Sequence, residues 1–363
     1  MKIALVHDDL IQQGGAEAMF AAMREIWPEA DVYTALTGKE QMASARTSFM
    51  QKIPFANRLY WYRALLPLYP LAFESFDLSN YDVVISSSSR FAHGVITRPE
   101  TLHVWYCYSP SRYAWLQSHA AWLQSIIAVM RQWDLVAAHR PDQIVAISQH
   151  VAKQVNHIYR RPVAAVVYPF VDSEKFRQSV SQPDNLPKAV SQKPYFLIVT
   201  RQVAWKKVDI AVEACNQLKV PLVIVGDGPD KQRLQNMAGS TVALLGHLTD
   251  RELVWYYQHC QAFLMTQEED FGIAALEAQA AGKPVIAYQG GGAKETVIDG
   301  QTGSFFYPQT AEALAAALKN FQASQWSAEA CQANAQRFRK SSFMTQLKKF
   351  VEDAWQKQQK TRN

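Results

Sequence analysis

The chain has 363 residues, 48% of them hydrophobic, which is enough for two domains with separate cores. Its formal net charge of +5 is modest, and its basic residues form no continuous stripe, so nucleic-acid binding is not expected. The N-terminus reaches two aspartates before an apolar run of signal length develops, and we expect no membrane-spanning segment. The four cysteines lack the spacing of metal ligands and are expected to be reduced core thiols of a cytosolic protein: Cys107, Cys215, Cys260 and Cys331.

The first half of the chain alternates apolar strands with helices. We predict strands at 3–6, 82–86, 102–107, 143–147 and 164–168, and helices over 16–26 and 112–139. Strands that are apolar throughout and separated by helices indicate a parallel sheet covered on both faces.

The pattern restarts after residues 168–176. Strands are predicted at 195–200, 222–225, 242–245, 261–264 and 284–287, with helices near 208–218, 231–237, 250–258 and 273–281. The sequence therefore predicts an α/β fold of two Rossmann-like doubly wound domains, 1–169 and 170–341, facing each other across a cleft. In such sheets ligands bind at the carboxyl ends of the strands. Residues 342–363 follow, with an amphipathic helix over about 342–359.

Basic residues follow the first strand of the second half. Arg201 comes directly after this strand and Lys206 five residues later. At the carboxyl edge of a sheet, a guanidinium fork and an ammonium charge suit a diphosphate. A solvated basic turn is the alternative.

Two carboxylates stand eight residues apart in QEEDFGIAALEAQAAGKPVIAY (267–288). Glu269 precedes a predicted helix and Glu277 lies in its second turn, so both can face a ligand at the helix N-terminus. The helix N-terminus favours a phosphate, and the acids can accept hydrogen bonds from sugar and ribose hydroxyls. A solvated helix face is the other explanation for two glutamates at this spacing.

The second-half motifs resemble glycosyltransferase family 4, retaining enzymes with the two-domain GT-B fold. The matching residues are Glu269, Phe271, Gly272, Glu277 and Ala278, followed by Gly290-Gly291-Gly292 and Glu295. The resemblance implies that Arg201 and Lys206 bind the donor diphosphate, that Glu269 orients the donor sugar and that Glu277 holds the ribose. It also implies that the last helix crosses back to the first domain.

Further donor contacts are predicted around these residues. Ile273 and Ala274 open the helix, and His247 is a candidate for the wall of the base pocket. Gly15 stands in a loop like the family's Gly-Gly-x-Glu loop, although paired glycines are more often simply a turn. Tyr108, before Ser109-Pro110, occupies the place of a histidine that family members often carry near the donor sugar. Asp8 is a candidate on the acceptor side.

The same resemblance implies the reaction. The acceptor hydroxyl would attack on the face from which the nucleotide leaves, with the departing phosphate as base. No Asp-x-Asp pair suggests a metal site, so no metal or other cofactor is expected. The runs 66–89 and 277–297 look most like bacterial mannosyltransferases of polysaccharide and O-antigen assembly. GDP-mannose is therefore the expected donor and a glycan or lipid-linked saccharide the expected acceptor, with UDP-sugars left open.

Residues 41–73 suggest contact with an anionic membrane at the inner face of the cell membrane. This segment has no acidic residue and combines basic with aromatic side chains: Arg46, Lys52, Arg58, Arg63, Phe49, Phe55, Tyr60, Trp61, Tyr62 and Tyr69. Such a mixture suits a lipid interface. A pair of core helices whose arginines reach out to solvent is an equally good explanation.

Three other functions remain open. A sugar-nucleotide epimerase would need acid and base groups beside the sugar, and a phosphorylase would need a lysine for pyridoxal phosphate. Neither can be identified in the sequence. A non-catalytic sugar-nucleotide-binding protein is the third, and Tyr108 in place of histidine would then mark lost activity.

Overall fold

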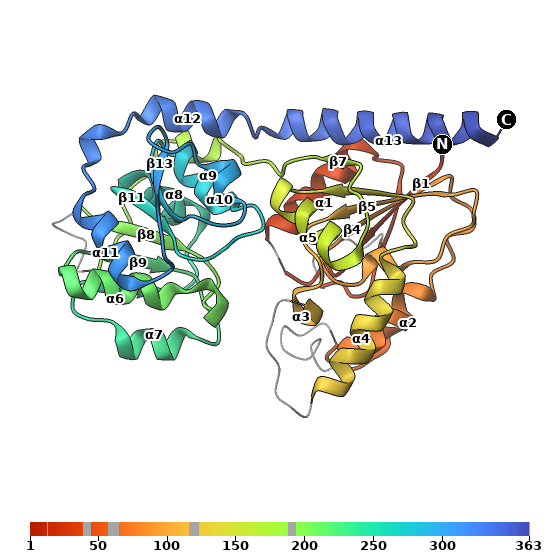
Figure 1. Cartoon of the computed structure of the whole chain (residues 1–363), viewed down its shortest axis with the longest axis horizontal. Coiled ribbons are helices and arrows are strands. Elements are labelled where there is room, and N and C mark those ends of the chain that lie inside the picture. Colours follow the sequence, from red (N-terminus) through yellow and green to blue (C-terminus); the bar gives the residue numbers. More distant parts are fainter. Residues whose placement is uncertain (13, 39–44, 57–64, 116–122, 188–193, 363) are drawn as a thin grey trace. The chain divides into compact units, whose positions relative to one another are not determined.

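A computed structural model of the chain describes residues 1–12, 14–38, 45–56, 65–115, 123–187 and 194–362. The chain divides into two compact units (Figure 1). Unit 1 comprises Met1–Pro169 and Phe343–Asn363, and unit 2 comprises Phe170–Ser342. The position of the units relative to each other, including the predicted cleft, stays a prediction.

Unit 1 is built on a seven-stranded parallel sheet in the order β3-β2-β1-β4-β5-β6-β7. Its strands are β1 (Ile3–His7), β2 (Asp31–Thr34), β3 (Arg46–Thr47), β4 (Val83–Ser88), β5 (Leu102–Cys107), β6 (Gln143–Ala146) and β7 (Ala165–Val166). The central strands β1, β4 and β5 are buried at every position, as expected for a sheet with helices on both faces.

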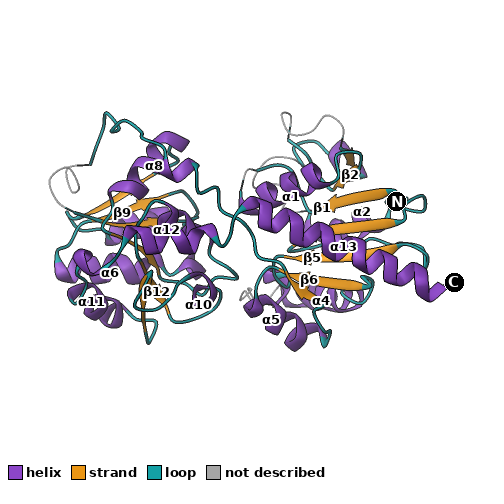
Figure 2. Cartoon of the chain, turned by 90° about the horizontal axis from the view of Figure 1, so that it is seen from above, coloured by secondary structure: helices purple, strands orange, loops and turns teal. Residues whose placement is uncertain are grey.

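The helices of unit 1 cover both faces of this sheet (Figures 1 and 2). They are α1 (Gly15–Ile26), α2 (Tyr69–Glu74), α3 (Arg112–Trp115), α4 (Gln124–Ala137) and α5 (Gln149–Tyr159). Buried residues of α2 and α4 share one core cluster with Ala4 and Val6 of β1. On α1 the buried side chains recur at helical spacing, at Met19, Phe20 and Met23, which explains why this segment forms an amphipathic helix.

Unit 2 is built on a six-stranded parallel sheet in the order β10-β9-β8-β11-β12-β13. Its strands are β8 (Phe196–Val199), β9 (Leu222–Val225), β10 (Val242–Leu245), β11 (Ala262–Met265), β12 (Val285–Tyr288) and β13 (Gly303–Phe306). Its helices are α6 (Val208–Leu218), α7 (Lys231–Met237), α8 (Asp250–His259), α9 (Ile273–Ala280), α10 (Ala293–Thr296), α11 (Ala311–Lys319) and α12 (Ala328–Gln336).

The last helix, α13 (Lys340–Arg362), begins in unit 2 and belongs to unit 1 from Phe343 onward. Its buried residues Phe343, Leu347 and Val351 recur every four positions and so lie on one face. Phe343 packs edge-on against Tyr106 of β5, with ring centroids 5.8 Å apart, and Arg362 donates to backbone carbonyls of unit 1. These contacts hold the helix along unit 1.

Some elements differ from the sequence-based prediction. Within the helix predicted over 112–139, the structure has two helices, α3 near its start and α4 near its end. Residues 116–122 between them lie outside the described part of the chain. The strand predicted at 164–168 has only two residues, at the sheet edge. Strands β2, β3 and β13 were not predicted, because DVYT, RT and GSFF contain no apolar run that stands out from a loop.

Candidate functional site

The ligand-binding position of a doubly wound sheet is the point where the strand order reverses. In unit 2 this point lies between β8 and β11, because β9 and β10 extend the sheet on the other side of β8. The loops that follow β8 and β11 carry Arg201, Lys206 and Glu269. The fold thus brings the two predicted motifs to one sheet edge.

Lys206 and Glu269 form an ion pair between these loops. The Lys206 ammonium contacts Glu269 Oε1, and the side chains are only 13% and 17% exposed. Gln267 Nε2 donates to the same oxygen over 2.7 Å, and Thr266 Oγ1 donates to the Lys206 carbonyl over 3.0 Å. The Lys206 ammonium also lies 4.3 Å from the centroid of the Trp205 ring. The structure thus fixes the position of the Lys206 ammonium, whereas its contact with a diphosphate stays a prediction.

Arg201 is exposed at the start of the loop after β8. The next residue fixes the loop, because Gln202 N donates to the Asp227 carbonyl over 2.9 Å and Gln202 Nε2 donates to the Gly226 carbonyl over 2.8 Å. A Cβ on Gly228 would lie 2.1 Å from the Gln202 carbonyl oxygen, so a side chain cannot be accommodated there. The glycines of VIVGDGP therefore allow the close approach that positions Arg201.

Helix α9 begins at the same edge as Lys206 and Glu269. Its N-cap Gly272 has a φ of 96°, in the left-handed region that favours glycine, and it provides no side chain to accept from the first amides of the helix. The Gly290–Gly292 loop supports this turn: Gly292 N donates to the Glu269 carbonyl over 2.7 Å, and a Cβ on Gly292 would lie 2.4 Å from Phe271 Cα. The amides of Ile273 and Ala274 thus lie at the helix start, behind a turn that the glycine loop fixes, and their contact with a donor stays a prediction.

Glu277 lies in the second turn of α9 and is half-buried. Its Oε2 accepts a hydrogen bond of 2.7 Å from the hydroxyl of Tyr257 on α8. Burial raises the pKa of Glu277, and the hydrogen bond from Tyr257 opposes that rise. The structure thus orients this carboxylate from within unit 2, whereas its contact with a ribose stays a prediction.

His247 follows β10 and is exposed at the same sheet edge. The backbone beside it is tied to the neighbouring loop, because Gly226 N donates to the Gly246 carbonyl over 3.2 Å. The place of His247 in the wall of a base pocket stays a prediction.

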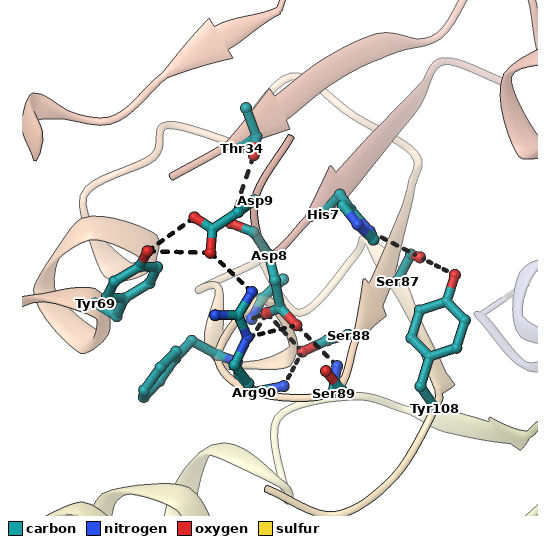
Figure 3. Close-up of polar contacts among 12 residues, drawn as sticks. His7, Asp8, Asp9, Thr34, Tyr69, Ser87, Ser88, Ser89, Arg90 and Tyr108 are labelled. Carbon is teal, nitrogen blue, oxygen red and sulfur yellow. Dashed lines mark hydrogen bonds and ion pairs between the residues drawn. The ribbon is translucent and has the colours of Figure 1, made fainter. Parts of the chain in front are cut away.

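In unit 1 the strand order reverses between β1 and β4, and a polar cluster lies at this point (Figure 3). Asp8 is 3% exposed and accepts four hydrogen bonds of 2.8–2.9 Å from the segment after β4: from Ser88 Oγ and from the amides of Ser89, Phe91 and Ala92. Burial favours the neutral acid, but Arg90, His7 and two of the amides outweigh it and hold the pKa of Asp8 below its usual value. Asp8 therefore shapes this loop, and its contact with an acceptor stays a prediction.

The neighbouring Asp9 was not singled out in the sequence. It is 2% exposed and accepts from the Tyr69 hydroxyl over 2.9 and 3.0 Å and from Arg90 Nη2 over 2.7 Å (Figure 3). Burial raises the pKa of Asp9 to about 7, against the opposing charge of Arg90. Two consecutive acids at the end of the first strand were the available signal. Tyr69 is fully buried, so its prediction as an interfacial aromatic residue is wrong.

Tyr108 lies under the first turn of α1. Its hydroxyl donates to the Ala16 carbonyl over 3.0 Å. The same hydroxyl is 2.8 Å from Ser87 Oγ, which is in turn 3.1 Å from His7 Nδ1 (Figure 3). Since Tyr108 has one proton, Ser87 donates to Tyr108 and His7 Nδ1 donates to Ser87. Burial lowers the pKa of His7 to about 4, so this chain of hydrogen bonds is uncharged at neutral pH. Tyr108 is thereby fixed beside the exposed Gly15, the other donor contact predicted for this domain.

The segment predicted to contact a membrane is described only in part. Phe49 and Phe55 are 44% and 54% exposed, and Lys52 is exposed. Arg46 pairs with Asp31 over 3.3 Å. The remaining basic and aromatic residues of the segment, Arg58, Tyr60, Trp61, Tyr62 and Arg63, lie outside the described residues. In the part of the chain that the structure covers, no helix has the length and apolar character needed to cross a membrane.

Two Rossmann-like parallel sheets, each with polar loops at its switch point, define a protein of the GT-B class, as predicted. Residues 183–338 match the family of glycosyl transferases group 1. The matched segment coincides with most of unit 2.

Known proteins are similar to this chain over different lengths. The GDP-mannose-dependent alpha-(1-6)-phosphatidylinositol monomannoside mannosyltransferase of Mycolicibacterium smegmatis is 30% identical over 179 residues, which are 43% of this chain and 47% of that protein. The chain thus spans about half the length of the curated relatives it matches.

Two solved structures show the same fold at low identity. Anabaena Alr3699/HepE in complex with UDP has a TM-score of 0.70 at 19% identity, covering 97% of this chain and 100% of that one. Sucrose-phosphate synthase of Thermosynechococcus elongatus has a TM-score of 0.76 at 16% identity, covering 98% and 99%.

Proposed function

We propose that this chain is a glycosyltransferase that moves a hexose from a nucleotide sugar to a glycan or lipid-linked saccharide of the cell surface. The observation that carries this proposal is the contact between Lys206 and Glu269 at the switch point of unit 2. An anion-binding ammonium and a hydroxyl-binding carboxylate are thus adjacent in a glycosyltransferase group 1 domain. A nucleotide sugar likewise carries a diphosphate directly attached to a sugar with hydroxyl groups.

The residues of unit 2 divide the recognition of the donor between them. Arg201, Lys206 and the first amides of α9 bind the diphosphate, because each offers N–H groups and positive charge or the positive end of a helix dipole. Glu269 accepts hydrogen bonds from the sugar, and Glu277 accepts from the ribose. A phosphate on Lys206 partly takes the place of the Glu269 carboxylate, which frees that carboxylate for the sugar.

The reaction proceeds without a metal ion and with retention of configuration. The acceptor oxygen forms a bond to the anomeric carbon as the bond from that carbon to the diphosphate oxygen breaks, on the same face of the sugar. The acceptor proton passes to the departing phosphate. Arg201 and Lys206 stabilise the negative charge that develops on the leaving group, and each contributes on the order of 3 kcal/mol in the transition state.

GDP-mannose is the proposed donor. The mannosyltransferase of Mycolicibacterium smegmatis is described as GDP-mannose-dependent and is similar over 179 residues. The second candidate is a UDP-sugar, because Anabaena Alr3699/HepE was crystallised with UDP on the same fold.

Thermal unfolding with GDP, UDP, ADP and their sugar conjugates tests the proposal, since a ligand of the folded state raises its stability. We expect one nucleotide series to raise the unfolding temperature of the wild type. Lys206→Ala should remove most of this shift, whereas Lys207→Ala, at the exposed neighbouring lysine, should keep it. No shift with any nucleotide, or equal loss in both variants, would contradict the proposal. Transfer or hydrolysis of the donor then distinguishes an enzyme from a non-catalytic binding protein.

Contact with an anionic membrane through residues 41–73 is a second proposal. Exposed Phe49, Lys52 and Phe55 support it. Co-sedimentation with vesicles of anionic and of neutral lipids is the test. We expect binding to anionic vesicles that weakens with salt, and weaker binding for Lys52→Glu. Equal binding to neutral vesicles, or none to either, would end this idea.

A further inference from the structure

The chain passes between its two units at two points, after Pro169 and after Ser342. We propose that the segment Phe338–Phe343 is a coupling element, which transmits occupancy of the nucleotide-sugar site in unit 2 to Tyr108 in unit 1. The inference rests on the proposed function and adds to it a link between the two sites. Phe338 and Phe343 are positioning residues in this scheme, because neither touches the substrate.

In unit 2 the coupling element packs directly on the donor loop. The rings of Phe338 and Phe271 are 5.5 Å apart at an angle of 70°, an edge-to-face contact, and the two side chains are only 4% and 3% exposed. Phe271 stands between Glu269 and Gly272, so it moves with the loop that holds the sugar-binding carboxylate and the start of α9. A ligand that fixes this loop therefore also fixes Phe338.

A buried polar network joins the same regions a second time. Asn334 Nδ2, at the end of α12, donates over 2.6 Å to Gln279 Oε1 on α9 and over 2.8 Å to the Thr296 carbonyl. Gln279 Nε2 donates to that same carbonyl over 2.8 Å. All three residues are buried. Because α9 and α12 are locked in this way, the helix that starts at the donor loop and the helix that leads into the coupling element form one packed block.

The two crossings of the chain are bonded to each other beside this block. Val171 N donates to the Phe338 carbonyl over 2.9 Å, and the Lys340 ammonium lies 5.9 Å from the centroid of the Phe170 ring. The first crossing therefore responds to the position of Phe338. Through Phe338, the donor loop is therefore in contact with the segments at both crossings.

On the other side of the crossing, the coupling element reaches the polar cluster of unit 1. Phe343 packs edge-on against Tyr106 at 5.8 Å, and Tyr106 packs edge-on against Tyr108 at 5.3 Å. The Tyr106 hydroxyl donates over 3.0 Å to the carbonyl of Val167, just before the first crossing. A shift of Phe343 would therefore displace Tyr106 and, through it, Tyr108. The Tyr108 hydroxyl is hydrogen-bonded to Ser87 and to the first turn of α1.

Hydrogen exchange of the full chain with saturating GDP or UDP tests the coupling. We expect nucleotide to slow exchange in the donor loop, 266–273, and also at the crossings, 167–171 and 338–343, by about 5-fold or more, within the usual range of coupling between sites. Phe338→Leu keeps an apolar side chain but removes the ring contact. In this variant the donor loop should still be protected, while the protection of the crossings falls below about 2-fold.

Phe321→Leu is the matched control, because Phe321 makes an edge-to-face contact of nearly the same geometry with Phe196, at 5.7 Å and 68°, away from the crossings. It should keep the nucleotide-dependent protection at both places. Protection of the donor loop without protection of the crossings in the wild type would overturn the coupling and leave the proposed function intact. Equal loss of coupling in both variants would also overturn it. No protection of the donor loop by any nucleotide would overturn the proposed function and the coupling together.

Discussion

Asp8 and Asp9 show how two adjacent carboxylates acquire opposite properties from their partners. Both are buried at the end of β1, and both face Arg90. Asp8 accepts three backbone amides and the Ser88 hydroxyl, which stabilise its charge. Asp9 has the Tyr69 hydroxyl and Arg90 but no such set of amides among its described contacts, so burial dominates and raises its pKa to about 7. If both aspartates were ionised, their two negative charges would face the single positive charge of Arg90. Protonation of Asp9 removes this excess negative charge.

The first prediction concerns the stability of unit 1 against pH. Because the pKa of Asp9 is raised from 3.8 to about 7, its folded state binds the proton more tightly. Its contribution is greatest below about pH 4, is lost as the pH rises to about 7, and is then constant. Asp9→Asn cannot ionise. We expect it to stabilise unit 1 at pH 8 by on the order of 2 kcal/mol and to have little effect at pH 4.

Thermal unfolding at both pH values measures this difference. Asp184→Asn, at an exposed position, is the control and should leave the profile unchanged. A variant Asp9→Asn that is less stable than wild type at pH 8 would mean that the ionised pair with Arg90 holds the loop, contrary to the expected balance.

A second prediction at the residue scale concerns Tyr257. Its hydroxyl donates to Glu277 and thereby opposes the rise of that residue's pKa. Tyr257→Phe removes the donor and should cost about 1 kcal/mol in stability. Glu277 then protonates at higher pH, so nucleotide binding should begin to weaken at a higher pH than in wild type. Binding titrations from pH 5 to 8 measure the shift, with Tyr256→Phe as the neighbouring buried control. An unchanged binding profile would show that Glu277 does not contact the nucleotide.

At the scale of elements, α8 depends on a capping box. Thr249 Oγ1 accepts from Glu252 N over 3.3 Å, and Glu252 Oε2 accepts from Thr249 N over 2.8 Å. Thr249→Ala should lower the free energy of unfolding of unit 2 by about 1 kcal/mol. Glu252→Gln should lower it by much less, because the amide oxygen of glutamine can still accept from Thr249 N. Urea unfolding measures both. If Thr249→Ala left the free energy of unfolding unchanged, the capping box would not stabilise α8.

The elements that the sequence predicted well share one property. Strands such as β9 and β10 are apolar runs bounded by helices, and their predicted ends match the structure. The missed strand β13, GSFF, has a glycine and a serine in place of such a run, and it is held by pairing with β12. Propensity alone could not find it, because its stability comes from the neighbouring strand.

The candidate site divides in a similar way. Lys206 and Glu269 could be predicted because each lies in a local motif, and the fold then brought them into contact. The cluster of Asp9, Tyr69 and Arg90 could not be predicted. These three residues come from β1's end, from α2 and from the segment after β4, so only the packing of unit 1 brings them together. The sequence predicted Tyr69 to lie at a membrane interface, but the packing of α2 against unit 1 buries it.

At the scale of the whole molecule, α13 makes the stability of unit 1 depend on the end of the chain. Phe343, Leu347 and Val351 are buried on one face of this helix, although the residues before it belong to unit 2. The chain order is therefore not the order of the folding units. A change near the C-terminus should act on the domain that contains the N-terminus.

The last prediction uses this arrangement. Leu347 on α13 and Leu314 on α11 are both fully buried, the first in unit 1 and the second in unit 2. Each change to alanine should cost about 2–5 kcal/mol through lost burial and a cavity. Hydrogen exchange should locate the loss in β5 and β6 for Leu347→Ala and in β8 and β9 for Leu314→Ala. If Leu347→Ala instead loosened unit 2, the helix would draw its stability from its neighbours in sequence, and unit 1 would end at Pro169.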